Sequence, residues 1–434
     1  MLVSFSVENW RSFRDKLTFS MIASAENNFK DRTLKISKRP IVRLLPIAAI
    51  FGGNASGKSN IVSAVQAARR FILGRRRLDG QTGFDSPFRL EEDCIKKPTR
   101  FSFVILVNIT KEKTRVFEYS FGVTQTTVTE EKLIQNNFSG SQELIFQRWI
   151  DSSGNVKFEG PLSKNKRNRF VFDGTRRNAL FLTSAYSQNV AEIEPVFKWF
   201  RESLHIVTPE MNYIDKNILN NQERLEEFSE ILDKYDTGIS GVTLEDAPPS
   251  TAGLAAFMLE TEMFSNGPRR MDLFERRGEV IFASEKSSSI ECKELKTLRR
   301  TKEGTPVKFS FSDESDGTRR LVDIIPICQS LAHEPGSVFI VDELDRRLHP
   351  NLVERIVLDY LSGIDESSRS QLIFTTHDAN LMDQRPLRRD EIWLVERGRD
   401  GVSELFSLAE FKARKDENIR KSYLVGRFGG IPRV

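Results

Sequence analysis

The stretch IAAIFGGNASGKS, residues 47–59, decides the fold. Its first five residues are a continuous apolar run, which predicts a strand buried on both faces in a parallel sheet. Two glycines end the run, and apolar residues after Lys58 recur at helical spacing, at positions 61, 64, 65, 68, 71 and 72. The stretch therefore predicts a strand, a glycine-rich turn and a helix in direct succession.

The turn, Gly52-Gly53-Asn54-Ala55-Ser56-Gly57-Lys58-Ser59, has the spacing GxxxxGK[ST] of a phosphate-binding loop. Successive backbone N–H groups of such a loop point inward at phosphate oxygens, and glycine permits the close approach. The motif assigns Lys58 to the β- and γ-phosphates and Ser59 to Mg²⁺. A purely structural glycine turn is the alternative, but the flanking strand and helix favour ATP and Mg²⁺ as cofactors.

Two further apolar runs end in residues that carry chemistry. The run 338–341 precedes Asp342 and Glu343, and a buried strand that delivers acids at its carboxyl end places them near a metal-bound nucleotide. Asp342 is expected to hold Mg²⁺ through water, and Glu343 to orient or deprotonate the attacking water. The run 372–376 ends at His377, one helix plus one strand further on, which predicts a γ-phosphate contact. The plainer alternatives are a solvated acidic strand end and a structural histidine.

The segment Ser315-Asp316-Gly317-Thr318 opens a predicted helix. A serine and a glycine at a helix N-terminus form an anion-binding end, so Ser315 and Gly317 are candidates for phosphate contact. The plainer interpretation is a helix cap, in which Ser315 bonds within its own first turn. Both interpretations stay open at this point.

The patterning of the whole chain predicts an α/β fold. Residues 101–188 hold β-rich segments between turn residues and predict an antiparallel β lobe. Residues 190–265 switch to helical patterns, and strand-like segments return after about residue 280. Residues 189–300 together are expected to form an inserted helical subdomain. Residues 1–100 and 301–434 alternate strands with helices, so they are expected to form the two parts of one head domain around a mostly parallel core sheet.

Composition bounds the function further. Of 434 residues, 39% are hydrophobic and 29% charged, which fits a globular protein and excludes a disordered chain. The net charge is only +4, so a basic surface must be local, and residues 164–177 and 269–300 are the candidates for binding nucleic acid or an acidic partner. Three scattered cysteines and the absence of a long apolar run predict a cytoplasmic protein with no membrane contact.

In this order, the phosphate loop, the Ser-x-Gly helix start, the acidic pair and the strand-linked histidine resemble the ABC-class ATPases of the SMC/RecF-like branch. Asn60 and the opening segment 9–13, NWRSF, are similar to that branch as well. The resemblance implies an ABC-type P-loop ATPase head that works as a homodimer or higher oligomer. The loop of one copy, with Asn60, would hold ATP, and Ser315 and Gly317 of a second copy would contact its γ-phosphate.

The same resemblance makes Glu343 and His377 the catalytic residues for ATP hydrolysis, and Ser59 and Asp342 the metal ligands. Segment 344–350 is similar to the loop that crosses the dimer interface in that branch. The sequence departs from the branch at Asp316, which stands where its relatives carry glycine. Only Gln81 offers a counterpart, a weak one, of the glutamine loop of the class.

The compact chain and its closing segment, 423–432, look like the small ATPases of bacterial phage-defence operons, of the RloA and PARIS AriA type. That resemblance implies an ATPase that senses invasion and controls a separate effector nuclease or toxin, with DNA or a phage protein as a further partner. The 57 residues after His377 are too few for a fused nuclease of about 100 residues. The alternatives are a RecF-like DNA-binding repair ATPase and a nucleotide-switched scaffold that does not hydrolyse ATP.

Overall fold

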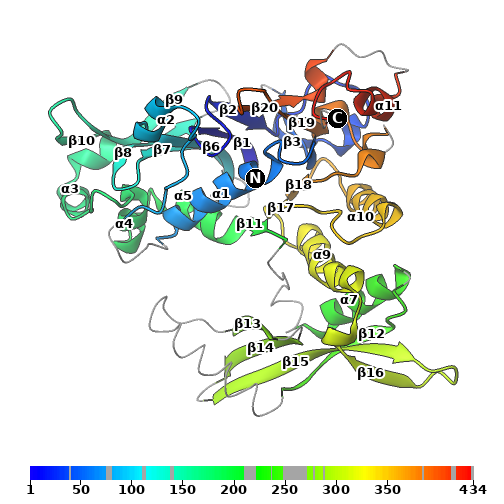
Figure 1. Ribbon diagram of the computed structural model, residues 1–434. Helices are drawn as coiled ribbons and strands as arrows, with labels where there is room; N and C mark the ends of the chain where they lie inside the picture. The colour runs from blue at the N-terminus through cyan, green and yellow to red at the C-terminus, as the bar shows by residue number, and fades with distance from the viewer. Residues whose placement is uncertain are drawn as a thin grey trace. The chain divides into compact units, whose positions relative to one another are not determined.

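The computed structural model describes residues 1–38, 41–74, 81–109, 114–136, 141–209, 221–235, 237–247, 271–276, 279–286, 289–383, 386–411 and 417–431. Their contacts divide the chain into two compact units (Figure 1). We call the first the head unit; it comprises Met1–Thr208, Glu334–Leu344 and Val357–Val434. The second, the inserted unit, comprises Pro209–His333 and Asp345–Ile356.

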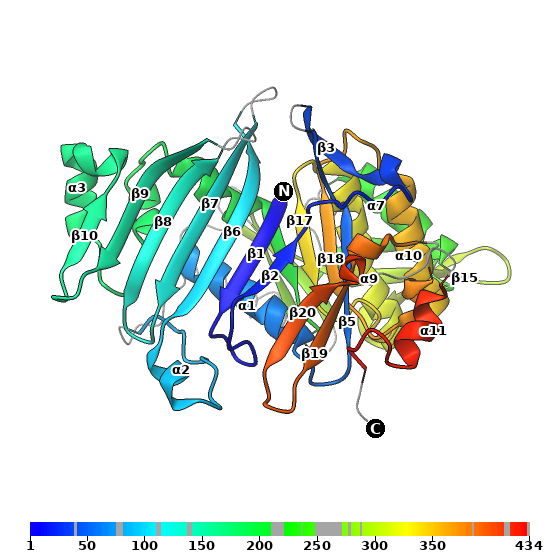
Figure 2. The same cartoon turned by 90° about the horizontal axis from the view of Figure 1, so that it is seen from above.

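A six-stranded core sheet lies in the head unit (Figure 2). Its strand order is β11 (Leu204–Val207), β17 (Val338–Val341), β18 (Gln371–Thr375), β5 (Ile47–Gly52), β19 (Ile392–Arg397) and β20 (Ser403–Ser407). All neighbours pair in parallel except β19 and β20. The sheet draws strands from both ends of the chain, which confirms the predicted α/β class with a mostly parallel core sheet.

Strand β11 lies in a region that the sequence assigned to helices. It follows α5 (Glu194–Lys198) and the π-helical turn η3 (Trp199–Ser203), and it pairs in parallel with β17 at the edge of the sheet. A four-residue segment such as this one, LHIV, directly after a helix cannot be separated from that helix by periodicity. Only the pairing with β17 identifies it as a strand.

A seven-stranded antiparallel sheet forms the rest of the head unit's strand structure. Its order is β10 (Val156–Glu159), β9 (Gln142–Ile150), β8 (Val128–Asn136), β7 (Thr114–Val123), β6 (Thr99–Asn108), β1 (Leu2–Glu8) and β2 (Leu17–Ser20). The predicted β lobe is therefore present, but it begins with the N-terminal strands, because β1 pairs with β6. The expected boundary between residues 100 and 101 falls inside β6.

Two segments with strand-like composition are helices in the structure. They are α3 (Lys166–Asp173) and α4 (Phe181–Ser187). The carboxylate of Glu131 on β8 accepts hydrogen bonds from the backbone N–H groups of Phe181 and Leu182, at 2.7 and 2.9 Å. This buried carboxylate satisfies donors at the start of α4 from 50 residues away, and such long-range contacts override local propensity.

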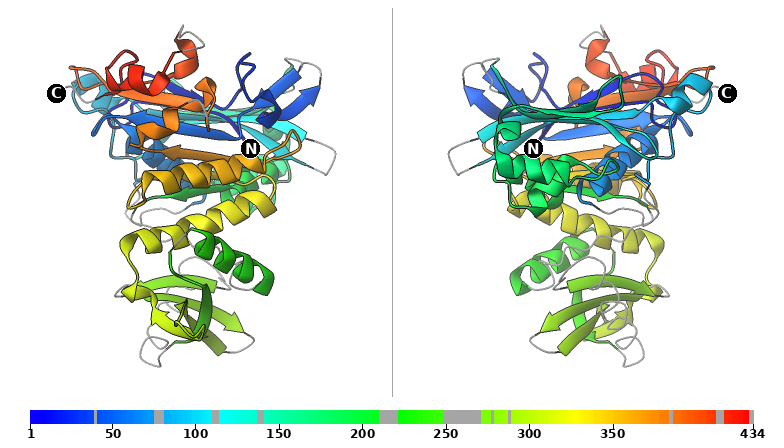
Figure 3. Two further views of the ribbon diagram at one scale, coloured as in Figure 1. Left: turned by 90° about the vertical axis from the view of Figure 1, so that its right-hand side faces the viewer. Right: turned by 90° about the vertical axis from the view of Figure 1, so that its left-hand side faces the viewer.

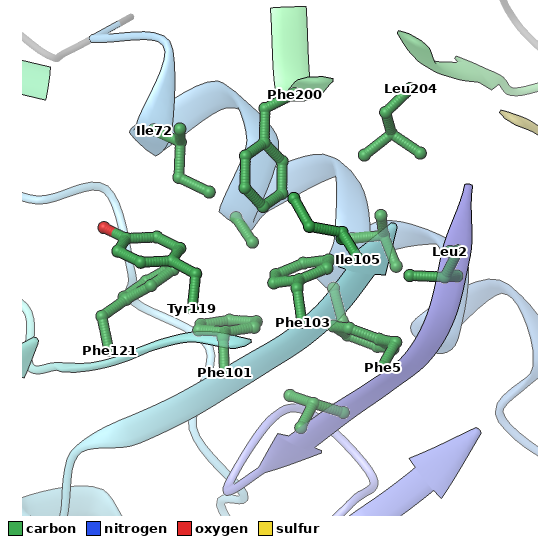
Figure 4. Packing of buried hydrophobic residues seen from close by; sticks show 14 of the residues in the cluster. Leu2, Phe5, Ile72, Phe101, Phe103, Ile105, Tyr119, Phe121, Phe200 and Leu204 are labelled. Atoms are coloured by element: carbon green, nitrogen blue, oxygen red, sulfur yellow. The ribbon is translucent and has the colours of Figure 1, made fainter. Parts of the chain in front are cut away.

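The hydrophobic core of the head unit is strongly aromatic (Figure 4). Phe101 of β6 stacks on Phe121 of β7 at 5.1 Å between ring centroids, and Phe103 meets Phe200 edge-on at 5.0 Å. Ile72, at the end of α1 (Lys58–Ile72), belongs to the same cluster. The inner face of the antiparallel sheet thus packs directly on the helix that follows the glycine-rich turn.

The remaining elements of the head unit are short. They are β3 (Leu34–Lys38), β4 (Ile41–Leu44), α2 (Glu92–Lys96), α11 (Ile419–Leu424) and the 3-10 turns η1 (Lys30–Arg32), η2 (Pro161–Lys164), η5 (Ala379–Met382), η6 (Arg389–Glu391) and η7 (Leu408–Glu410). Helix α10 (Pro350–Ser362) begins in the inserted unit and ends in the head unit. Among the described helices, none combines the length and apolar character that crossing a membrane requires.

The inserted unit is a mixture of sheet and helix. It contains α7 (Gln222–Lys234), α9 (Asp316–His333), the turn η4 (Phe311–Asp313) and an antiparallel sheet of β12 (Gly241–Asp246), β15 (Ser289–Arg300), β14 (Glu279–Lys286), β13 (Met271–Arg276) and β16 (Pro306–Ser310). Figure 3 shows α7 between α9 and the strands of this unit. The predicted helical subdomain is therefore only part of the unit. Strand β15 is rich in Lys, Glu and Arg, which disfavour strands, and its pairing with β12, β14 and β16 compensates.

Candidate functional site

Three neighbouring parallel strands end at one edge of the core sheet. In the register of these strands, Val341 of β17 lies beside Phe374 of β18, and Thr375 lies beside Ile50 of β5. The acidic pair, the histidine and the glycine-rich loop each follow directly after one of these strands. Residues that are far apart in sequence therefore meet at this edge, as the strand pattern predicts.

Lys58 occupies the inside of the loop. Its side-chain Nζ donates to the carbonyl oxygens of Gly52 at 2.7 Å and Gly53 at 3.1 Å, and the residue is only 6% exposed. The Nδ1 atom of His377 lies 3.5 Å from the same ammonium group, across 319 residues of sequence. The structure thus brings together the lysine and the histidine that the sequence predicts at the γ-phosphate.

The predicted metal ligands also lie together. The hydroxyl of Ser59, in the first turn of α1, donates to Oδ1 of Asp342 at 3.3 Å. The hydroxyl of Thr375, fully buried on β18, donates to the same oxygen at 2.5 Å and accepts the backbone N–H of Glu343 at 2.8 Å. Sequence reasoning did not single out Thr375, although a polar residue that ends an apolar strand beside the predicted acids was a usable signal.

Glu343 has a left-handed backbone conformation, with φ at +51°. Residues other than glycine rarely adopt it, and it persists where surrounding contacts impose it. Here both flanking N–H groups are held by one residue, because the N–H of Glu343 bonds to the Thr375 hydroxyl and that of Leu344 to the Thr375 carbonyl at 3.0 Å. This fixed, strained turn sets the direction in which the Glu343 side chain leaves the sheet.

Two glycines of the loop stand where no side chain fits. A Cβ atom at Gly52 would lie 2.6 Å from both the Ser56 hydroxyl and the Val395 carbonyl. At Gly57, φ is +118° and a Cβ would lie 2.9 Å from the hydroxyl of Ser403. The tight turn that phosphate binding requires therefore depends on glycine at both positions.

Ser403 of β20 holds the loop from outside. Its hydroxyl donates to the Ser56 carbonyl at 2.5 Å, and its N–H donates to the carbonyl of Ser12 at 2.8 Å. The peptide group is planar and trans, so a carbonyl anchored outward turns the next N–H, that of Gly57, in the opposite direction. Ser403 therefore orients a backbone donor toward the inside of the loop. No motif in the sequence marks it, because β20 lies 347 residues from Ser56.

Asn60 supports the loop through the N-terminal turn. Its side-chain amide donates to the Ser12 hydroxyl at 2.8 Å, its Oδ1 accepts from Arg11 at 3.3 Å, and its carbonyl accepts from Trp10 Nε1 at 3.1 Å. The described contacts of Asn60 are therefore structural, whereas its predicted contact with the nucleotide stays a prediction. They explain why the NWRSF segment accompanies the loop: it buttresses the first turn of α1.

The site fits a triphosphate with Mg²⁺. The loop has backbone donors and a lysine for phosphate oxygens, and the Ser56 hydroxyl is buried without a hydrogen-bond partner in the described structure. Ser59 offers a hydroxyl and Asp342 a carboxylate, the kinds of oxygen that Mg²⁺ prefers. With Asp342 acting through water, positions remain for phosphate and water.

The Ser315 segment lies in the inserted unit, at the start of α9. The Ser315 hydroxyl accepts the backbone N–H of Thr318 at 3.2 Å, so the structure shows the helix cap that the sequence left open. Ser315 itself is exposed. A Cβ at Gly317 would lie 2.9 Å from the carbonyl of Arg347, and Arg347 pairs with Asp316 at 3.4 Å. A contact of Ser315 and Gly317 with phosphate stays a prediction.

The family model described as AAA domain, putative AbiEii toxin, Type IV TA system matches residues 47–383. The chain belongs to this family. Membership makes it a P-loop ATPase-domain protein and indicates that ATP is bound, in agreement with the sequence. The match spans the loop, the acidic pair and His377, which the structure places at one sheet edge. No curated protein matches the chain.

Several solved structures are similar to this AAA-domain protein at low identity. An SMC head domain from Thermotoga maritima is 13% identical over 94% of this chain and 98% of that one, with a TM-score of 0.38. An SMC head bound to the C-terminal winged-helix domain of ScpA is 16% identical over 94% and 97%, with a TM-score of 0.40. The recombination mediator RecF with ATP is 13% identical over 93% and 97%, with a TM-score of 0.35.

Proposed function

We propose that this protein hydrolyses ATP at the carboxyl edge of its core sheet and thereby controls a separate effector nuclease or toxin in bacterial defence against phage. The observation that carries the hydrolytic part is the meeting of Lys58, Asp342, Glu343 and His377 at that edge. The toxin–antitoxin context in the family description supports the defence part.

The loop and α1 bind the nucleotide in this proposal. Backbone N–H groups of residues 53–58 hold the β-phosphate, and Lys58 exchanges its carbonyl partners for oxygens of the β- and γ-phosphates. Ser59 and Asp342 hold Mg²⁺, which neutralises charge on the phosphates when it is bound. Thr375 keeps the Asp342 carboxylate turned toward Ser59 through its 2.5 Å hydrogen bond.

Glu343 and His377 act on the attacking water and the γ-phosphate. Glu343 accepts a proton from the water, and the rigid turn at its backbone aims its carboxylate. His377 is exposed and lies beside the Lys58 ammonium, so it can contact the γ-phosphate that the lysine binds. The two catalytic residues follow neighbouring strands, which keeps their separation constant.

A second copy of the chain completes the site. Ser315 and Gly317 at the exposed start of α9 contribute the phosphate contacts that cover the nucleotide, and ATP therefore holds a homodimer together. The close packing of Gly317 on the backbone of Arg347 supports this arrangement, because it links the start of α9 to the segment predicted at the dimer interface. The protein acts in the cytoplasm, and its effector is a separate chain.

The test combines two measurements on the purified chain with one in cells. Purified wild type should hydrolyse ATP in the presence of Mg²⁺, and ATP should shift its mass in light scattering from monomer to dimer. Cells that carry the gene with its neighbouring genes should resist phage, and Lys58→Ala should abolish that resistance. Absence of ATP hydrolysis would overturn the enzymatic assignment. Resistance that survives in the Lys58→Ala cells would overturn the proposed control of the effector.

A further inference from the structure

Residues 164–177 hold an unusual concentration of positive charge. Six of the fourteen residues are Lys or Arg and one is Asp, which gives a local net charge of +5. The whole chain carries +4, so the remainder is slightly negative. The other predicted basic region, 269–300, lies partly outside the described residues, at 269–270, 277–278 and 287–288.

Three of these six cations lie in α3, which stands beside β10 at the edge of the antiparallel sheet, and the other three lie in the segments that flank the helix (Figure 2). The inner side of the helix buries Asn168 and Val171, and Phe172 stacks on Phe158 of β10 at 4.3 Å with the rings nearly parallel. The helix is thus firmly attached by one side. We call its outer side and flanking turns the α3 surface; its members are Lys164, Lys166, Arg167, Arg169, Phe170, Arg176 and Arg177.

The cations of the α3 surface are exposed and uncompensated. All six are exposed, and within the described part of the chain none of them forms an ion pair. The guanidinium of Arg167 donates to the carbonyl of Gln188 at 2.7 Å, which fixes that side chain without neutralising it. Clustered charges of one sign create a local potential that attracts an anionic partner. The surface therefore fits a polyanion.

The exposed ring of Phe170 indicates which kind of polyanion the surface binds. Its side chain is 80% exposed, although a buried phenylalanine would be stabilised by roughly 1.5–3 kcal/mol. Lys166 lies four residues before it and therefore on the same face of the helix, so a cation neighbours the ring. In single-stranded nucleic acid, the phosphates bind cations and the unstacked bases stack on exposed aromatic rings. A duplex keeps its bases stacked on one another and has no free base for the ring.

We propose that the α3 surface binds single-stranded nucleic acid, with phosphates on its lysines and arginines and a base stacked on Phe170. The surface lies on the antiparallel sheet and contains no residue of the phosphate loop. Binding of nucleic acid there therefore goes beyond the ATPase function and does not require ATP. If about five phosphates are neutralised, log K should fall with log salt at a slope near −3 to −4.

Fluorescence polarisation of a labelled fifteen-residue oligothymidine with the full-length protein tests the charges. The double variant Lys166→Glu and Arg169→Glu should weaken binding at least 30-fold. The control is Lys96→Glu with Lys97→Glu at α2, two exposed lysines whose reversal changes the net charge by the same amount. The control should bind within twofold of wild type. Failure of wild type to bind at low salt, or equal weakening by both variants, would overturn the proposal.

A second set of variants tests the ring. Phe170→Tyr keeps stacking and should bind like wild type, whereas Phe170→Leu keeps an apolar side chain without a ring and should bind about tenfold more weakly. Polyglutamate should compete poorly. Equal binding by the two variants together with strong competition by polyglutamate would identify an acidic protein as the partner and overturn the proposal. Lys58→Ala should bind the oligonucleotide like wild type. The binding test therefore remains valid even if the protein does not hydrolyse ATP.

Discussion

The carboxyl edge of the core sheet and the start of α9 carry the two halves of the predicted chemistry, and they are assembled differently. At the sheet edge each functional side chain meets one from a distant segment: Ser59 bonds to Asp342 across 283 residues, and Lys58 lies beside His377 across 319. At the start of α9, the partner of the Ser315 hydroxyl is Thr318, three residues further on.

At the sheet edge, one chain brings the functional groups together. At the start of α9, the chain only exposes candidate groups. The sheet edge has converging groups with fixed mutual distances, because parallel strands hold them in register. The Ser315 turn is satisfied locally as a helix cap, so its own contacts give no reason for the Ser-x-Gly pattern beyond helix initiation and the packing of Gly317. In the proposed dimer, its chemical role would come from a nucleotide brought by another copy.

The largest expected effect tests the catalytic part of the sheet edge. Glu343→Gln should lower the kcat of ATP hydrolysis about 10²- to 10⁴-fold, because the amide cannot accept the proton of the attacking water. ATP affinity should stay within a few-fold of wild type, and the ATP-bound dimer should accumulate in light scattering. The control is Glu404→Gln, an exposed glutamate on β20. Equal turnover in Glu343→Gln and wild type would remove the assigned role.

The next effect concerns nucleotide binding at the same edge. Lys58→Ala should weaken ATP binding roughly 10- to 100-fold in calorimetry, because each hydrogen bond to a charged group is worth ~1.5–3 kcal/mol. Lys421→Ala removes an exposed lysine of α11 and serves as the control for overall charge. Unchanged affinity in Lys58→Ala would show that the loop does not hold the triphosphate.

Substitution of Ser315 tests the role of the start of α9. Ser315→Ala should lower kcat about tenfold with little change in ATP affinity, because the hydroxyl acts only once a second copy closes on the nucleotide. Ser315→Asn keeps a good helix cap, so loss of activity in both variants separates phosphate contact from helix stability. Full activity of Ser315→Asn would leave the serine as a cap only.

A smaller effect is expected at Ser403, which holds the phosphate loop from outside. Ser403→Ala should weaken ATP binding about three- to tenfold, since a net hydrogen bond is worth ~0.5–1.5 kcal/mol and the Gly57 N–H loses its orientation. Ser407→Ala is a matched control on the same strand: Ser407 is 7% exposed against 5% for Ser403, and its hydroxyl accepts from Ala409 instead of binding the loop. Equal affinities of these two variants would show that the loop keeps its shape without Ser403.

A change at the opposite, amino-terminal edge of the core sheet should affect the stability of the fold and leave nucleotide binding unchanged. Glu391 precedes β19 and is buried, and burial raises its pKa from 4.5 to about 8. Because the folded state holds the proton more tightly than the unfolded state, stability is greatest at low pH and falls as pH rises from about 4.5 to 8. The slope is up to ~1.4 kcal/mol per pH unit. Above that range stability levels off.

Chemical denaturation between pH 5 and 8 measures this dependence. Glu391→Gln should remove most of the slope and be more stable than wild type near pH 8, with unchanged ATP affinity. Glu404→Gln, at an exposed position, should retain the wild-type slope. A wild-type unfolding free energy that is independent of pH in this range would contradict the raised pKa.

Much of the sheet edge was predictable because its motifs are local. A glycine-rich loop between a strand and a helix, and acids after an apolar strand, are visible within a few residues of sequence. Ser403 was missed because it acts through hydrogen bonds to segments far away in sequence, and a single serine carries no pattern. Thr375 did carry a signal, as a polar residue that ends an apolar strand. Helix α4 was misassigned for the same reason that Ser403 was missed, since Glu131 caps it from another strand. Helix α3 was misassigned as well, although its cap, Asn165, is local.

The sequence by itself determined the phosphate loop, the acidic pair, the strand that precedes His377 and the mostly parallel sheet, because spacing and periodicity encode them within short windows. Only the tertiary structure decided that β1 and β2 complete the antiparallel sheet, that β11 extends the core sheet, and that Asn60 braces the N-terminal turn. Strand pairing and side-chain hydrogen bonds join residues whose separation in sequence is arbitrary, so no local pattern records them.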